Sequence, residues 1–212
     1  MNSATSLSRL VQQRFPQHVL ATHQYRGDDT VILKREGLLE VGRFLRDDPE
    51  SALNFLMDLS CADYLTFGKA AGSAPRLNTP SPLPYFMTPK PSTETWDRVV
   101  GQDYRFEVVY HLYSLTKNHR LRVKVPLTDA EPALDSVASL WAAANWYERE
   151  AWDMFGIRFN GHPNLRRILM YEEFQGHPLR KDYPIYKRQP LIGPVSQEPA
   201  APRVPIIVGM NE

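Results

Sequence analysis

Residues 104–127 read YRFEVVYHLYSLTKNHRLRVKVPL and contain the clearest strand pattern in the chain. Successive side chains of a strand point to opposite faces, so apolar residues at every second position mark one face. Residues 104–115 and 120–127 both follow this rule, with Lys117-Asn118-His119 between them. We therefore expect an antiparallel hairpin. Its apolar face carries Phe106, Val108, Tyr110 and Leu112 from the first strand, and Leu121, Val123 and Val125 from the second.

The other face of the second strand is basic. Arg120, Arg122 and Lys124 alternate with the apolar residues of this strand. A basic face could bind phosphate, but charged side chains on a half-exposed strand are usually solvated. We therefore expect these three side chains to face water, and phosphate binding is the less favoured alternative.

The sequence before the hairpin predicts two helices and two strands. Residues 7–15 and 37–46 carry apolar side chains at helical spacing. Residues 18–25 alternate weakly, and residues 30–33 are β-branched and apolar, which favours strands in both places. Residues 53–59 are apolar but few, so their periodicity fits either a strand or the end of a helix.

After the hairpin, residues 135–155 show the strongest helical pattern. Asp135 or Ser136 can cap the start of this helix, and Gly156 can end it in a left-handed turn. An apolar stripe along the helix is expected to pack on the apolar face of the hairpin. The stripe consists of Leu140, Ala144, Tyr147, Ala151 and Met154.

These elements predict an α+β fold with two parts. Residues 1–155 would form a small α/β domain, whose mixed or antiparallel sheet is packed by helices. This domain includes a proline-rich insertion, residues 68–102, in which a central strand or helix is improbable because each proline fixes φ and lacks a backbone donor. The insertion is either a solvated loop or an arm ordered by a neighbouring subunit. Residues 156–212 contain only short runs broken by glycine and proline, so we expect an extended, partner-binding C-terminal segment.

Composition excludes several classes of function. The net charge of +1 gives no overall field that would attract nucleic acid or an anionic membrane. Cys61 is the single cysteine, so the chain cannot form an internal disulfide or bind an iron–sulfur cluster through its own thiolates. No apolar run approaches the ~20 residues that a membrane-spanning helix needs.

The charged residues that follow the helical stripe suggest a structural clamp. Glu148 and Glu150 would flank the buried stripe, where carboxylates strongly favour an arginine partner. We expect the segment after Gly156 to fold back and supply these partners from Arg166, Arg167, Arg180 and Lys181. Arg149 would point away from the stripe, one turn from Asp153, where an intrahelical ion pair can form. The alternative is that both glutamates are solvated.

Catalytic motifs are missing from the sequence. There is no G-x-S-x-G sequence, and nothing links Cys61 to either His162 or His177. The two histidines follow glycine and precede proline in separate loops, unlike the paired ligands of an H-E-x-x-H helix. We therefore expect turn histidines that donate to backbone carbonyls, and no catalytic, cofactor-binding or metal-binding residue.

The same segment resembles the 30 kDa subunit family of respiratory complex I, the proton-pumping NADH:quinone oxidoreductase. The family signature fits Glu148-Arg149-Glu150, Asp153, Met154-Phe155, His162, Arg166 and Ile168-Leu169 without a mismatch. Residues 176–184, GHPLRKDYP, also look like a stretch of the family. The resemblance covers residues 148–184 and is highly specific.

This resemblance implies a non-catalytic structural subunit of the peripheral arm, in a complex that passes electrons from NADH through FMN and iron–sulfur clusters to quinone. The chain would bind no cofactor of its own, since FMN and the clusters belong to partner subunits. Its partners would be the 49 kDa quinone-site subunit and the subunit with the terminal cluster, on the cytoplasmic side of the cell inner membrane. An equivalent subunit of a membrane-bound hydrogenase or a ferredoxin-fed quinone-reducing complex is the alternative. The expected structural and partner-interface residues are Glu148, Arg149, Glu150, Asp153, His162, Arg166, Arg167, His177, Arg180, Lys181 and Asp182.

Overall fold

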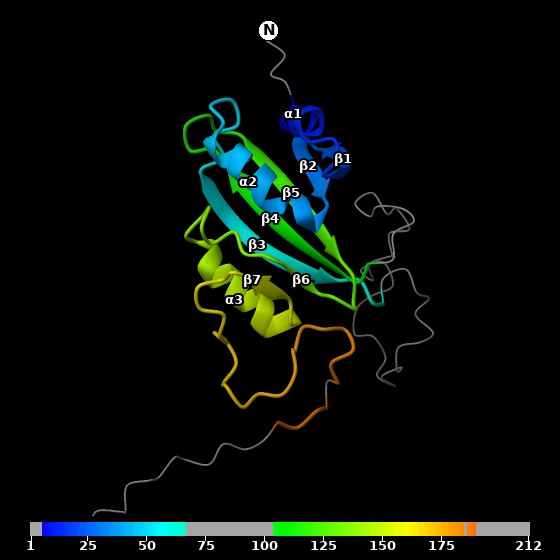
Figure 1. Cartoon of the computed structure of the whole chain (residues 1–212). Helices are drawn as coiled ribbons and strands as arrows, with labels where there is room; N and C mark the ends of the chain where they lie inside the picture. The colour runs from blue at the N-terminus through cyan, green and yellow to red at the C-terminus, as the bar shows by residue number, and fades with distance from the viewer. Residues whose placement is uncertain (1–5, 67–103, 185, 190–212) are drawn as a thin grey trace, which may run out of the picture.

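A five-stranded mixed sheet forms the centre of the computed structural model, which describes residues 6–66, 104–184 and 186–189 (Figure 1). The strands are β1 (Val19–Tyr25), β2 (Asp28–Leu33), β3 (Phe55–Asp63), β4 (Phe106–Tyr113) and β5 (Arg120–Leu127). Their order is β1-β2-β5-β4-β3, and every neighbouring pair is antiparallel except β2 and β5. The predicted α+β class is therefore confirmed. The proline-rich insertion and the tail beyond residue 189 lie outside the described residues.

The predicted hairpin is present as β4 and β5, with Tyr110 opposite Val123. The ambiguous residues 53–59 belong to strand β3, which extends to Asp63. A bulge lies between Leu56 and Asp58, where the pairing with β4 shifts. Because a bulge inserts an extra residue, it breaks the alternation that would have identified the strand from sequence. The ladder continues past β3, since the Tyr64 N–H donates to the Arg105 carbonyl at 2.8 Å.

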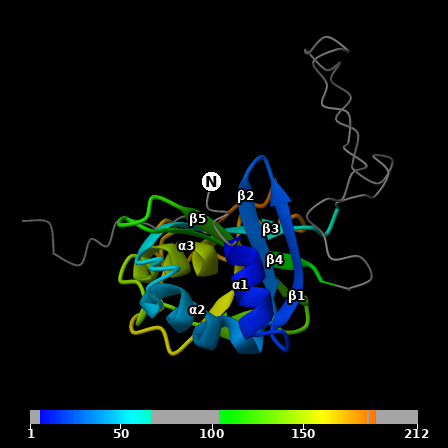
Figure 2. The same ribbon diagram turned by 90° about the horizontal axis from the view of Figure 1, so that it is seen from above.

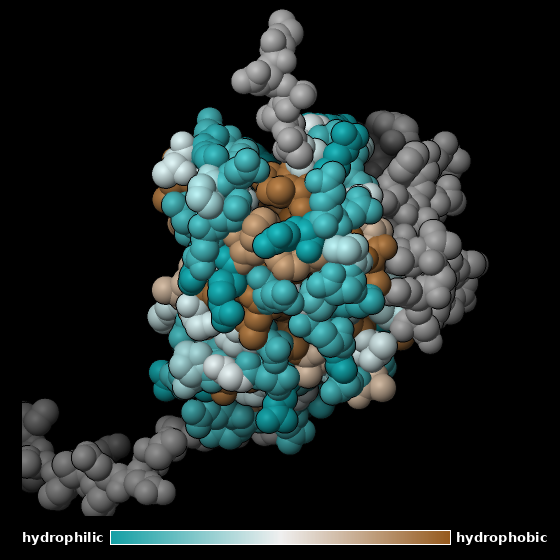
Figure 3. Space-filling model, turned by 45° about the horizontal axis from the view of Figure 1, so that its top comes forward, coloured by the Kyte–Doolittle hydropathy of each residue, from teal (hydrophilic) through white to brown (hydrophobic). Residues whose placement is uncertain are grey.

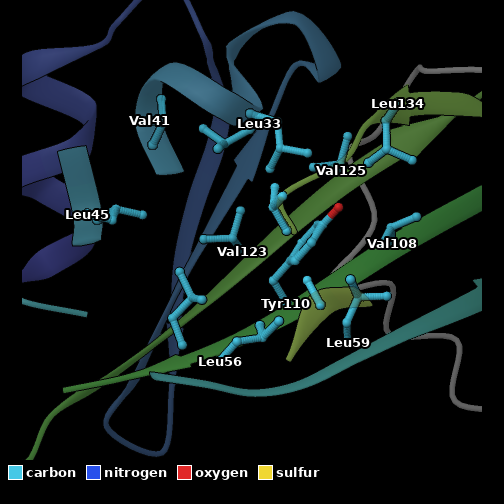
Figure 4. Packing of buried hydrophobic residues seen from close by; sticks show 14 of the residues in the cluster. Leu33, Val41, Leu45, Leu56, Leu59, Val108, Tyr110, Val123, Val125 and Leu134 are labelled. Atoms are coloured by element: carbon cyan, nitrogen blue, oxygen red, sulfur yellow. The ribbon is translucent and has the colours of Figure 1, made fainter. Parts of the chain in front are cut away.

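Helices cover one face of the sheet (Figure 2). They are α1 (Leu7–Arg14), α2 (Leu38–Asp47), which follows the short 3₁₀ helix η1 (Arg35–Gly37), and α3 (Ala144–Phe155). Their apolar residues form one cluster with the alternating side chains of β4 and β5, including Val108, Tyr110 and Val123 (Figure 4). On the face that Figure 3 shows, hydrophobic side chains are visible between hydrophilic ones. No helix among the described residues is long and apolar enough to cross a bilayer.

The helix predicted over residues 135–155 begins later, at Ala144. Ala133–Asp135 forms strand β6, which pairs in parallel with β7 (Arg158–Asn160), and turns occupy the residues between β6 and α3. Neither proposed cap is correct, because the residue at the N-cap is Ala143. The start was misjudged because buried Val137, Leu140 and Trp141 in those turns imitate a helical spacing.

The end of α3 agrees with the prediction. Gly156 closes the helix with φ at +76°, a left-handed conformation that favours glycine. A Cβ atom at this position would also lie 2.7 Å from the ring of His177. The helix contacts β3 in particular, where the Tyr147 hydroxyl donates to the Met57 carbonyl at 3.1 Å. The packing partner of α3 is therefore chiefly the neighbouring edge strand.

The basic face of β5 is less solvated than expected. Lys124 is 4% exposed, and its Nζ lies 3.1 Å from Oε1 of the buried Glu107. The same carboxylate oxygen accepts a hydrogen bond from the Tyr64 hydroxyl at 3.1 Å. The expectation of a water-facing Lys124 was therefore wrong, because a buried carboxylate on β4 compensates its charge. Arg120 is exposed and Arg122 is half-buried.

Candidate functional site

The carboxylate of Asp153, on the last turns of α3, is the centre of the returning C-terminal segment. Its Oδ1 accepts from Arg167 Nη1 at 2.5 Å. Its Oδ2 accepts the backbone N–H groups of Ile168, Leu169 and Met170 at 3.1, 2.9 and 2.9 Å. Burial alone would raise the pKa of the Asp153 carboxyl, but these donors outweigh burial and hold the pKa below its usual value. Asp153 therefore fixes the backbone of this segment to the helix.

Arg167 extends the same contacts to the next turn of the segment. Its Nη2 donates to the carbonyl oxygens of Phe174 and Gly176 at 2.9 and 3.2 Å. Its guanidinium also lies 5.7 Å from the ring centroids of both Trp152 and Phe174. A single arginine thus joins the helix to two stretches of the coil. The sequence predicted that an arginine of this segment folds back onto the helix.

Arg149 binds the same segment from the preceding turn of α3. It is buried, and its guanidinium donates to the carbonyl oxygens of Arg166 and Arg167 at 3.2 and 3.1 Å. It also lies 5.1 Å from the ring centroid of Trp146. The predicted pairing of Arg149 with Asp153 was wrong, because the coil covers this side of the helix and its carbonyls bind the guanidinium. Arg166 itself is exposed, and the contact with Arg149 uses its carbonyl.

The predicted clamp was assigned to the wrong carboxylates. Glu148 is buried, but it accepts from the Ser136 hydroxyl at 2.6 Å and the Val137 N–H at 2.7 Å. It makes no ion pair with an arginine in the described part of the chain, and Glu150 is exposed. Glu148 instead fastens the turn after β6 to α3. Burial raises the pKa of Glu148 to about 7, against the opposing effect of its two donors.

Both histidines behave as the sequence predicted, since each hydrogen-bonds a backbone carbonyl. His162 Nδ1 accepts the N–H of Asn164 at 3.0 Å, so the proton is on Nε2, which donates to the Asn145 carbonyl at 3.0 Å. That Nε2 lies 3.9 Å from Oε2 of Glu148. His177 Nδ1 donates to the Asp153 carbonyl at 2.9 Å, and burial lowers the pKa of His177. The histidines therefore tie loops to α3.

A second cluster holds the coil at the end of the sheet, around the buried Arg105. Its guanidinium contacts Asp63 at 3.1 and 3.0 Å, Asp129 at 3.1 and 3.0 Å, and Asp182 at 2.8 Å. The backbone N–H of Lys181 also donates to Asp63 Oδ2, at 2.8 Å. Burial opposes the charge of Arg105, but the three carboxylates raise its pKa further above the usual value. The C-terminal coil is thus fixed to β3 and β4.

Arg180 joins this cluster from the coil. Its guanidinium lies 3.1 Å from Asp129 and 3.4 Å from Asp182, and 5.0 Å from the ring centroid of Phe106. The exposed side chain of Lys181 takes no part in the contact made by its backbone. The sequence identified Arg180 and Asp182 but missed Arg105, Asp63 and Asp129, because nothing in their spacing indicates that they meet.

The geometry of the two clusters is suited to holding backbone in place. The buried carboxylates of Asp153 and Asp63 accept several N–H donors each, which stabilises their ionised form. A general base needs a carboxylate or imidazole within hydrogen-bond reach of a substrate proton. These oxygens already bind donors of the chain itself, so the arrangement fixes a path of backbone along α3 and the sheet.

The chain is similar to known proteins of one family. Residues 31–189 match the model described as respiratory-chain NADH dehydrogenase, 30 Kd subunit. A subunit of the NADH-quinone oxidoreductase of Citrifermentans bemidjiense is 43% identical over 188 residues, which are 88% of this chain and 94% of that protein. The subunit of the same name from a Roseiflexus species (strain RS-1) is 40% identical over 185 residues, 87% of this chain and 86% of that one.

A solved structure agrees in fold alone. A chain in the membrane-bound sulfane sulfur reductase, an archaeal respiratory membrane complex, is 15% identical, with a TM-score of 0.57 and 85% of each chain covered. The family model spans β3, β4, β5, α3 and both clusters, and the two bacterial relatives cover most of the chain. The chain therefore belongs to the respiratory-chain NADH dehydrogenase 30 kDa subunit family.

Proposed function

We propose that this chain is a structural subunit of the peripheral arm of a proton-translocating NADH:quinone oxidoreductase, and that it supplies no catalytic, cofactor-binding or metal-binding residue. The complex would pass electrons from NADH through FMN and iron–sulfur clusters, held by partner subunits, to quinone. Family membership and the names of the relatives support this role. The carboxylates of Asp153 and Asp63 already accept several hydrogen bonds from the chain itself, which supports a structural role for the charged residues.

The observation that carries the proposal concerns the C-terminal coil. Side chains of the folded domain hold its backbone in place, while apolar side chains of the coil are exposed. Asp153 and Arg105 anchor the backbone of this coil, while Leu169, Leu179 and Tyr186 are 56%, 50% and 81% exposed. A backbone ordered before binding loses less entropy when a partner docks, and exposed aromatic residues are common in interfaces. We therefore propose that the segment 156–212 binds a partner through the coil that follows β7, since Ile157 and Phe159 at its start are buried in the core.

The proposed partners are the 49 kDa quinone-site subunit and the subunit that carries the terminal iron–sulfur cluster. The complex would lie at the cell inner membrane, with this chain on the cytoplasmic side. Of the eleven residues singled out in the sequence, Arg149, Asp153, Arg167 and His177 would hold the first part of the docking coil, and Arg180 and Asp182 the second. Glu148 and His162 would hold the turn after β6 and the loop after β7 to α3, while Glu150, Arg166 and Lys181 have exposed side chains available to a partner.

The test is affinity purification of the full-length tagged chain, with identification of co-purifying subunits and assay of NADH:quinone activity. The double variant Leu169→Asp, Leu179→Asp should lose the 49 kDa subunit and the activity, while circular dichroism of the free chain stays unchanged. Leu115→Asp is the matched control, because Leu115 is 64% exposed in the hairpin turn. Retention of all subunits by the double variant would refute docking through the coil.

The related role in a membrane-bound hydrogenase or ferredoxin-fed complex has less support. The bacterial relatives are NADH-quinone oxidoreductase subunits at 43% and 40% identity, whereas the likeness to the archaeal complex concerns the fold alone. The same purification separates the two roles. Co-purification of a ferredoxin- or hydrogen-reactive subunit, without NADH oxidation, would favour the second.

A further inference from the structure

The sheet has a second face that none of the described helices covers. Side chains of β4 and β5 alternate, so His111 and Arg122 point away from the face of Tyr110 and Val123, which packs on the helices. Figure 2 shows α1, α2 and α3 together on the other side of the strands. Lys124 and Glu107 on this face are buried, but its other end, at His111 and Arg122, is only half-buried and offers surface that the described helices do not use.

This face is hollowed near one end of the strands. A cavity of about 340 Å³ is lined by Asp28, Met57, Asp58, His111, Leu112, Arg120, Leu121 and Arg122. The sheet register sets the polar residues in a row, because His111 is opposite Arg122 on one side and Asp58 on the other. None of the lining residues belongs to the C-terminal coil, so this hollow is separate from the proposed docking segment.

Two polar groups in the hollow have no partner among the described residues. The half-buried side chains of Arg122 and His111 make no hydrogen bond or ion pair within that part of the chain. By contrast, Arg120 lies 3.9 Å from Asp28. Burial, followed by the nearby Arg122, lowers the pKa of His111, so its ring is a neutral N–H donor at pH 7. A guanidinium and an imidazole N–H side by side match the two oxygens of a carboxylate.

The surroundings of the hollow have the character of a protein interface. Phe55 and Met57 on β3 are 45% and 43% exposed, and Tyr25 on β1 is 59% exposed. Aromatic residues, methionine and arginine are enriched in interfaces, and arginine and tyrosine often carry most of the binding energy. The edge itself is unsuited to adding another strand, because the bulge after Leu56 disrupts the ladder. Side chains of the face, rather than backbone, would make the contacts.

We propose that this face docks another protein chain, and that one carboxylate side chain of that chain enters the hollow between Arg122 and His111. Asp28 and Asp58 on the walls disfavour a dianionic phosphate more strongly than a singly charged carboxylate. Exposed Phe55 and Met57 beside the hollow would have no function with a small anion, whereas a protein surface covers them. Phosphate binding, the alternative considered from the sequence, therefore fits this site less well than a protein carboxylate.

Zero-length crosslinking in the purified complex tests the proposal. Arg122→Lys keeps the positive charge and introduces an amine that a carbodiimide can couple to a carboxylate in direct contact. We expect mass spectrometry to find an amide between position 122 and an Asp or Glu of another subunit. The control is Arg43→Lys on α2, an exposed position on the helical side of the sheet, where coupling to that same carboxylate should not occur.

A second measurement uses the unmodified chain, so that it does not depend on the folding of a variant. Hydroxyl-radical oxidation of Met57 should be slower in the complex than in the free full-length chain. The proposal is overturned if position 122 couples only to Asp28 or Asp58 of its own chain, or if Met57 is oxidised equally in both states. It is also overturned if inorganic phosphate shifts the His111 ring signals of the free chain while Met57 stays unprotected in the complex.

Discussion

Arg105 and Asp63 form two parallel hydrogen bonds, of 3.1 and 3.0 Å, where β3 ends and β4 is about to begin. The same carboxylate accepts the N–H of Lys181 from the other end of the described chain. One buried ion pair therefore joins the sheet and the C-terminal coil. Each of the two buried charges is compensated by the other.

Removing the arginine of this pair should be costly. Arg105→Gln leaves Asp63 buried without its counter-ion, and we expect a loss of about 3–5 kcal/mol in the free energy of unfolding. Urea denaturation of the full-length chain measures the loss. Arg35→Gln is the control, since Arg35 pairs with Glu36 and Glu131 at the surface and should cost less than about 1 kcal/mol. Equal effects of the two substitutions would show that the Arg105 cluster does not stabilise the fold.

Asp153 should control the order of the coil directly. Asp153→Asn keeps the size of the side chain but removes the charge that binds Arg167 and the backbone N–H groups of residues 168–170. We expect faster hydrogen exchange of those three amides and a stability loss of about 3 kcal/mol. Exposed Glu150→Gln, three residues earlier on the same helix, should change stability by less than about 0.5 kcal/mol. Unchanged exchange in Asp153→Asn would contradict the anchoring role.

Glu148 should make stability depend on pH in a known direction. Its folded pKa of about 7 lies above the usual 4.5, so the unfolded chain releases this proton first as the pH rises. The contribution of Glu148 is therefore complete below pH 4.5, falls between pH 4.5 and 7, and is constant above that range. The fall should be about 3 kcal/mol. Urea denaturation of the wild type and of Glu148→Gln across this pH range isolates the contribution of Glu148 to stability. Parallel pH profiles of the two proteins would exclude this contribution.

Two glycines allow backbone strain to be separated from a steric clash. Gly156 and Gly161 have similar positive φ values, +76° and +73°, but a Cβ at Gly156 meets the His177 ring whereas Gly161 has free space. Gly161→Ala should cost about 1 kcal/mol, from backbone strain alone. Gly156→Ala should cost clearly more, and His177→Ala in the same chain should recover the excess. Similar thermal stabilities of the two single variants would show that the His177 contact adds nothing.

The parts of the fold that sequence predicted are those set by local pattern. Alternation along β4 and β5 identified the hairpin, and Gly156 identified the end of α3. Strand β3 stayed ambiguous because its bulge interrupts the alternation. The start of α3 was placed too early because buried residues in turns can fall at helical spacing by coincidence.

The sequence predicted the type of contact at the site but not which residues pair. The sequence correctly indicated that an arginine returns to a carboxylate on α3, but it assigned the carboxylate to Glu148 and Glu150 instead of Asp153. Helical angles alone do not show which side of a helix a later coil will cover. The pair Arg105 and Asp63 is separated by 42 residues, and only the antiparallel register of β3 and β4 brings the two together.

The hydrogen bond from Tyr64 to the carbonyl of Arg105 has a consequence for engineering and for evolution. It places Tyr64 and Arg105, which flank the proline-rich insertion in the sequence, next to each other at the end of β3 and β4. A change in the length of the chain between Tyr64 and Arg105 therefore does not by itself require a change in the register of β3 and β4. A fluorescent reporter or an epitope could be grafted there, and the assembled complex could then be tracked in living cells.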